Sequence, residues 1–139
     1  MLLRVPLVVM QKAIFARLSG DIAPVPVYAY VPDNSAFPLV QIHDFTITDE
    51  STKGAGIASV TYMVGIASRE TGILELQALI DDVVNSLSRA PFDLEPDGWK
   101  HTITRLEFCE AFPPEEGVGE IINVAELRFR FVLTDLQVQ

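Results

Sequence analysis

The stretch of sequence that decides the fold is residues 48–87, which read TDESTKGAGIASVTYMVGIASRETGILELQALIDDVVNSL. The first nine residues are polar and include two glycines, a composition that predicts an exposed loop. From residue 59 to Ser68 the side chains alternate, and this period of two predicts a strand. Its apolar side consists of Val60, Tyr62, Val64 and Ile66. The other side is small rather than charged, and Gly65 within it indicates a bulge or a close approach by other atoms.

The second half of the stretch predicts an amphipathic helix. Apolar residues recur there at spacings of three and four, and they are Ile73, Leu76, Leu79, Ile80, Val83, Val84 and Leu87. Polar residues such as Glu75 and Asp81 lie away from this stripe. Pro91 predicts the end of the helix, because the residue before a proline disfavours helical geometry. A strand followed directly by such a helix indicates a domain that combines both element types.

The remaining sequence predicts one more helix and four more strands. Residues 6–19 carry apolar side chains at helical spacing. Strands are expected at residues 27–31, 37–47, 102–112 and 121–133. In the second of these the alternation slips, and a bulge near His43 and Asp44 reconciles its two halves. The last two strands are expected to pair as a hairpin around PPEEGVG, residues 113–119.

These elements predict a single domain over residues 1–139 of the α+β class, with the order α-β-β-β-α-β-β. We expect a mixed, mostly antiparallel sheet of four to five strands with both helices packed on one face. A chain of this length buries enough surface to be stable without a disulfide. The one cysteine, Cys109, lies in a predicted strand, where we expect it to be buried as a small apolar residue.

Composition excludes several classes of function. The net charge is −9 and the basic residues are scattered, which disfavours binding to nucleic acid through phosphate contacts. One cysteine and two histidines exclude zinc sites of the usual spacing. No apolar run reaches the length of a membrane span, and the run near the N-terminus is too short for a secretory signal. We therefore expect a protein that is made and kept in the cytoplasm until it joins an assembly or stays soluble, and that binds neither a membrane nor a cofactor.

Motifs for catalysis are poor. The GAG at residues 54–56 lacks the spacing of a phosphate-binding loop, and no Gly-x-Ser-x-Gly motif occurs. His43 and Asp44 are adjacent in a strand, so we expect them to point to opposite faces rather than to act together. A cluster of carboxylates surrounds the predicted hairpin turn without the spacing of a metal loop: Glu107, Glu110, Glu115, Glu116 and Glu120. We expect no enzymatic activity and no metal site.

Three polar surfaces are better candidates for contacts with other proteins. They are the loop that opens residues 48–87, the acidic tip of the last hairpin and the polar side of the last strand. The residues that we expect to contribute are Asp49, Glu50, Lys53, Glu115, Glu116, Arg128 and Arg130.

Taken together, these segments resemble the tail completion or tail terminator proteins of long-tailed phages. The resemblance covers nearly the whole chain. It is carried by QKAIFARL (11–18), VPVYAYVP (25–32), FPLVQI (37–42), TDESTKGAG (48–56), VTYMVGIASRETG (60–72), LELQALIDDVVNSL (74–87) and ELRFRFVL (126–133). Phage-like gene transfer agents carry relatives of this family.

The resemblance implies a structural protein of the virion. Such proteins form a hexameric ring that caps the tail tube, ends its polymerisation and presents the surface for head-tail joining. The implied partners are other copies of the chain, the major tail tube protein and the head-tail connector or neck protein. DNA would pass through the ring without specific binding, which an acidic protein suits because like charges repel. The implied location is the neck region of the tail, with the host cytoplasm as the site of assembly.

Two alternatives remain open at the level of the sequence. One is a different neck or minor tail protein, which is also structural. The other is a small enzyme or a ligand-binding α+β domain.

Overall fold

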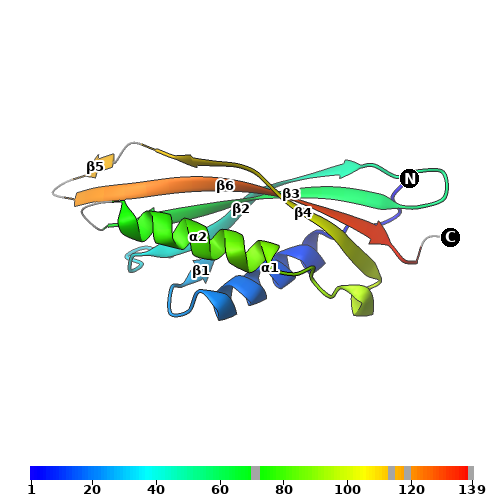
Figure 1. Cartoon of the computed structure of the whole chain (residues 1–139), viewed down its shortest axis with the longest axis horizontal. Coiled ribbons are helices and arrows are strands. Elements are labelled where there is room, and N and C mark those ends of the chain that lie inside the picture. Colours follow the sequence, from blue (N-terminus) through cyan, green and yellow to red (C-terminus); the bar gives the residue numbers. More distant parts are fainter. Residues whose placement is uncertain (70–72, 113–114, 118–119, 138–139) are drawn as a thin grey trace.

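The fold is a single twisted sheet with both helices against one of its faces (Figure 1). The coordinates are a computed structural model that describes residues 1–69, 73–112, 115–117 and 120–137, with the backbone alone for 115–117, 120 and 121. No helix in these ranges is long and apolar enough to cross a membrane.

The observed elements follow the predicted order, with one short strand added inside the last hairpin. The helices are α1 (Leu7–Asp21) and α2 (Leu74–Ser88), and a short 3-10 helix, η1 (Glu95–Asp97), precedes β4. The strands are β1 (Val27–Tyr28), β2 (Leu39–Asp49), β3 (Ile57–Ser68), β4 (Trp99–Ala111), β5 (Glu115–Gly117) and β6 (Glu120–Asp135). The strand order is β1-β2-β3-β6-β4, and β5 pairs with β6 outside this path.

The sheet is mixed and mostly antiparallel, as predicted. The one parallel contact described joins β1 to β2 at Val27 and Val40, and the other pairs are antiparallel. The centre is the β3–β6 pair, which runs without a break from the partners Ile57 and Thr134 to the partners Ser68 and Asn123. Predicted hairpin partners β4 and β6 also pair, and this confirms the expected closing hairpin.

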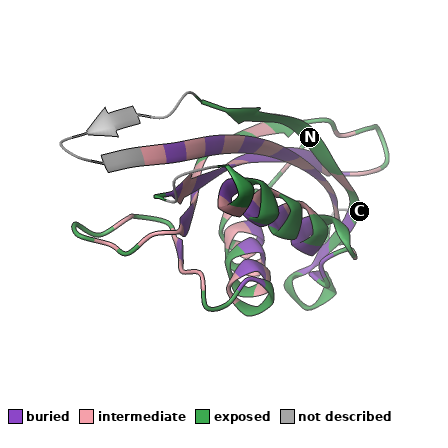
Figure 2. Cartoon of the chain, turned by 60° about the vertical axis from the view of Figure 1, so that its left-hand side comes forward, coloured by how far each residue is buried: buried purple, intermediate pink, exposed green. Residues whose placement is uncertain are grey.

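The core lies between the helices and the face of the sheet that they cover. Figure 2 shows buried and partly buried residues alternating along β6, whereas β3 is buried at most of its positions. Alternate residues of β6 are fully buried: Ala125, Leu127, Phe129, Phe131 and Leu133. They meet the buried residues of the helices, which are Met10, Ile14, Leu18, Leu76, Leu79, Val83 and Leu87. The apolar stripe predicted for α2 was wrong at Ile73, which precedes the first helical residue and is exposed.

Two predictions about loops and strands need correction. The loop expected at residues 48–56 is shorter, because β2 continues to Asp49 and the Glu50 N–H bonds to the Ile57 carbonyl at 2.9 Å. Cys109 is exposed rather than buried. Cys109 lies on β4, which is an edge strand of the sheet. The C-terminal half of β4 pairs with a strand on one side only, and its side chains are exposed.

The predicted bulge in β2 is present. The pairing with β3 shifts between His43 and Phe45, and Asp44 has a φ of 40°. The extra residue explains why the apolar positions of β2 change sides along the sequence.

Arg4 ties the N-terminal segment to the far end of β6. Its guanidinium lies 2.7 Å from the Asp135 carboxylate, donates to the Asp97 and Gly98 carbonyls at 3.1 and 2.6 Å, and stacks 4.6 Å from the centre of the Trp99 ring. The Asp135 side chain is 1% exposed, and its hydrogen bond with Arg4 lowers the pKa of that carboxyl. A buried carboxylate depends on such a partner.

His101 is buried beside the aromatic core, with its ring centre 5.7 Å from that of Phe131. Nδ1 accepts the Phe92 N–H at 2.9 Å, so the ring proton of the neutral form is on Nε2, which lies 3.0 Å from the Ile103 carbonyl. Burial lowers the pKa of His101, because the charged imidazolium is poorly solvated there.

Replacing Arg4 with alanine is expected to lower the free energy of unfolding by about 2 kcal/mol, because the Asp135 carboxylate keeps its burial and loses its main partner. Arg4→Lys should lose less, since it keeps the charge but not the forked geometry. Arg105→Ala is the control, because Arg105 is exposed and has no ion pair within the described residues. Chemical denaturation measures all three, and equal losses for the two alanine variants would contradict the assignment.

Stability should also decline when the pH falls below about 6.5, the ordinary pKa of histidine in an unfolded chain. The pKa of His101 is lower in the folded state, so the unfolded chain takes up this proton first and gains from acidification. His101→Asn retains an acceptor for the Phe92 N–H but cannot be protonated. Urea titrations between about pH 7 and pH 5 should show a smaller slope for the variant than for the native chain. An equal dependence of the unfolding free energy on pH in both proteins would contradict this role for His101.

Candidate functional site

The face of the sheet that the helices leave uncovered, here called the open face, carries a row of charged side chains. Arg130 Nε donates to Glu107 Oε2 at 2.9 Å, and Arg130 also bonds to the Ser59 hydroxyl. Arg128 Nε lies 2.9 Å from Glu107 Oε1 as an ion-pair contact rather than a directed hydrogen bond. Thus Arg128 and Arg130, predicted to meet a neighbouring protein, share a carboxylate within the chain.

Glu107 reaches both arginines because β4 has a bulge. The pairing of β4 with β6 shifts between Leu106 and Phe108, so Glu107 is the extra residue and has no direct partner on β6. The sequence places Glu107 in a strand but gives no sign of this shift, so the pairing could not be deduced without the register.

A second polar link crosses the open face from β2 to β6. His43 Nε2 lies 2.8 Å from Glu126 Oε2, and His43 Nδ1 lies 3.2 Å from Asp44 Oδ2. The prediction that His43 and Asp44 point to opposite faces was therefore wrong, because the bulge at Asp44 interrupts the alternation. Gly65 lies below this link, and a Cβ there would be 3.1 Å from Glu126 Oε1, which confirms the predicted close approach.

This polar link offers no arrangement for metal binding. Within the ranges that the structure describes, no group of three or more histidine, cysteine, aspartate or glutamate side chains could hold a metal ion. His43 links β2 to β6 through Glu126, and its other ring nitrogen contacts Asp44 of its own strand.

The turn between β2 and β3 holds three of the predicted contact residues. Asp49 accepts the Ser51 N–H at 2.9 Å and the Leu2 N–H at 3.0 Å, and hydrogen bonds from Ser51 and Leu2 lower its pKa to about 2. The side chains of Glu50 and Lys53 are exposed beside it. Asp49 is thus committed to the chain's own turn, whereas its neighbours face solvent.

The predicted contact residues do not form one site. Glu115 and Glu116 lie in β5, at the opposite end of the sheet from the β2–β3 turn (Figure 1), and their side chains are outside the described part. Arg128 and Arg130 lie between these ends on β6. Their role in contacts with other proteins stays a prediction.

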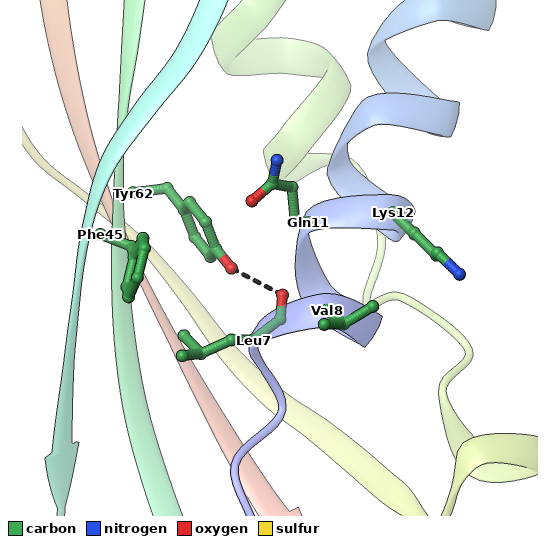
Figure 3. A pocket seen from close by; sticks show the side chains of 6 residues that line it. All are labelled: Leu7, Val8, Gln11, Lys12, Phe45 and Tyr62. Carbon is green, nitrogen blue, oxygen red and sulfur yellow. Dashed lines mark hydrogen bonds between the residues drawn. The ribbon is translucent and has the colours of Figure 1, made fainter. Parts of the chain in front are cut away.

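An apolar groove beside β2 was missed at the level of the sequence. It has a volume of about 450 Å³ and lies between the start of α1 and β2 (Figure 3). Tyr62 forms its floor and donates a hydrogen bond to the Leu7 carbonyl at 2.8 Å, and burial raises the pKa of Tyr62 to about 12. Val8 and Phe45 are exposed at 67% and 56%. The lining residues are Leu7, Val8, Gln11, Lys12, Phe45 and Tyr62.

The sheet has two outer edges, at β2 and at β4, that are largely unpaired within the described residues. Among the described strands, β2 has β1 as its outer neighbour at Val40 and Gln41 alone, so its remainder pairs on one side with β3. At the other side of the sheet, β4 pairs with β6 and with no further described strand. Large apolar residues are exposed along β4, namely Ile103, Leu106 and Phe108. Open edges with apolar side chains are typical of surfaces that receive another strand.

Comparison with known proteins agrees with this architecture. Residues 12–132 match the family described as Tail completion protein gp17. A solved chain from the virion of a native gene transfer agent (GTA) particle has the same fold, with a TM-score of 0.74 and 17% sequence identity over 90% of this chain and 94% of that chain. The comparison with functionally curated proteins yields no match.

The fold and the family match define a structural protein of a phage-type tail. The chain belongs to the Tail completion protein gp17 family. The matched region begins in the second turn of α1 and ends near the C-terminal end of β6. The resemblance deduced from the sequence is thereby confirmed.

Replacing Glu107 with alanine is expected to lower the free energy of unfolding by about 1 kcal/mol, because two partly exposed arginines then lose their shared carboxylate. Glu110→Ala is the matched control on the same strand, since Glu110 is exposed and has no ion pair in the described ranges. The control should change stability by less than about 0.5 kcal/mol. Denaturant titration of both variants measures the difference. A loss of unfolding free energy for Glu110→Ala as large as for Glu107→Ala would contradict a stabilising role for the shared Glu107 carboxylate.

Proposed function

We propose that the chain is the tail terminator of a phage or a phage-like particle such as a gene transfer agent. It caps the tail tube as a ring of six copies, ends the polymerisation of the tube and forms the surface to which the head joins. The observation that supports this most strongly is the family match over residues 12–132. Its partners are other copies of itself, the major tail tube protein and a head-tail connector protein.

A ring requires each copy to present two different surfaces, one to each neighbour. The molecule has such a pair in the outer edges of β2 and β4, which lie at opposite sides of the sheet. No chemical step is needed for this role, because a cap acts by occupying the end of the tube. The protein would act in the neck of the tail after assembly in the host cytoplasm.

The net charge of −9 suits a channel through which DNA passes. A negative surface repels phosphates, so DNA crosses the ring without specific binding. The charge also argues against a role in which this protein holds DNA at the neck.

Particles made without the chain should carry tail tubes of variable and excessive length that lack heads, because nothing stops tube growth. Negative-stain electron microscopy measures the length distribution, and supplying the native chain in trans should restore a single length. Tubes of normal length that fail to join heads would indicate the alternative role of another neck protein. Tubes of normal length that carry heads would overturn both structural roles at the neck.

A further inference from the structure

We propose that neighbouring copies of this chain join edge to edge, with β2 of one copy pairing antiparallel to β4 of the next. This inference rests on the proposed function, since it supplies the contact between copies of the ring. The segments involved are residues 42–48 of β2 and 103–109 of β4.

The strand directions make the pairing possible without turning one copy over. β2 is antiparallel to β3, β3 to β6, and β6 to β4, so β4 runs opposite to β2 within one molecule. Shifting a second copy sideways along the sheet therefore brings its β4 antiparallel to β2 of the first copy. Because the two edges differ, the contact is heterologous and can repeat until a ring closes.

One register also matches the irregularities of the two strands. Each segment carries one extra residue, which is Asp44 in β2 and Glu107 in β4. When Phe45 is placed opposite Leu106, these two extra residues lie opposite each other. The pairing then continues on both sides, and Thr48 comes to lie opposite Ile103.

Exposed apolar side chains cover one another in this register. Phe45 and Leu106, exposed at 56% and 37%, lie on the side of the helices and close the groove above Val8. On the open face, Ile103 and Phe108 are exposed at 47% and 41%, and they gain cover from the polar residues Thr48 and His43 that lie opposite them on β2 of the neighbour. Burial of these surfaces favours association by the hydrophobic effect.

The charges of the two edges are complementary. Lys100 and Arg105 on β4 are exposed, and within the described ranges neither has an ion-pair partner. In the proposed register Lys100 lies near Glu50, and Arg105 lies diagonally across from Asp44. The residue directly opposite Asp44 is Glu107, whose carboxylate is already paired with Arg128 and Arg130 of its own chain. Agreement in direction, bulge position, apolar exposure and charge favours a second copy of this chain over an unrelated partner.

Disulfide trapping tests the pairing directly. Thr48→Cys combined with Ile103→Cys, in a chain with Cys109→Ser, should form covalent chains of up to six copies when assembled particles are oxidised. Paired residues of adjacent strands are close enough for such a bond. The matched control is Thr48→Cys with Glu110→Cys, which the register places about 20 Å apart along the strands, and it should give no such products.

Lysine substitution tests the same contact without a crosslink. Ile103→Lys should reduce the amount of chain bound to tail tubes at least tenfold, since a lysine on an edge opposes strand addition. Leu74→Lys is the control, because Leu74 is 78% exposed on α2 and away from both edges. Both variants should have the same melting temperature as the native chain to within a few degrees, measured by circular dichroism.

The outcomes separate this inference from the proposed function. Chains that cap tubes at the normal length without the Thr48–Ile103 crosslink would overturn the edge pairing and leave the terminator role intact. Crosslinked rings that do not affect tube length would support the pairing and overturn the terminator role. Crosslinks from either cysteine to a different particle protein would overturn the pairing, because another partner then occupies the edge.

Discussion

The pairing of β3 with β6 is the interaction on which the rest of the structure depends. It joins residues 57–68 to residues 123–134 without a bulge, and it buries alternate side chains of both strands under the helices. Phe131 lies at the centre of an aromatic group, with ring centres 5.7 to 6.5 Å from those of His101, Phe92, Phe129 and Tyr62. β2 and β4 are added on either side of this regular pair, and both contain bulges. The centre therefore supplies stability, and the irregular outer strands supply surface.

The sequence predicts the central strands and helices well because their patterns are long. The alternation that includes Val60 and Ile66 indicates a strand, and the apolar stripe that includes Leu76 and Val83 indicates a helix. The outer strand β4 is predicted as a strand but not as an edge, since alternation does not reveal how many neighbours a strand has. This is why Cys109 was expected to be buried although it is exposed.

The candidate site was less predictable because it depends on register. Arg128 and Arg130 are recognisable as the polar side of β6, but their shared partner Glu107 follows from a bulge that leaves no trace in the sequence. The groove beneath Phe45 likewise arises from the distance between α1 and β2. The two sheet edges are therefore better candidates for contact surfaces than single charged residues. They differ from each other, as the two contact surfaces of a ring-forming protein must.

A reconstruction of the head-proximal end of the tail by electron cryomicroscopy would show directly whether the edges of neighbouring copies meet. Six copies of this chain are expected in a closed ring, with β2 of each copy about 4.8 Å from β4 of the next, which is the spacing of hydrogen-bonded strands. A ring in which both edges face solvent, or in which a different protein covers them, would contradict the edge pairing.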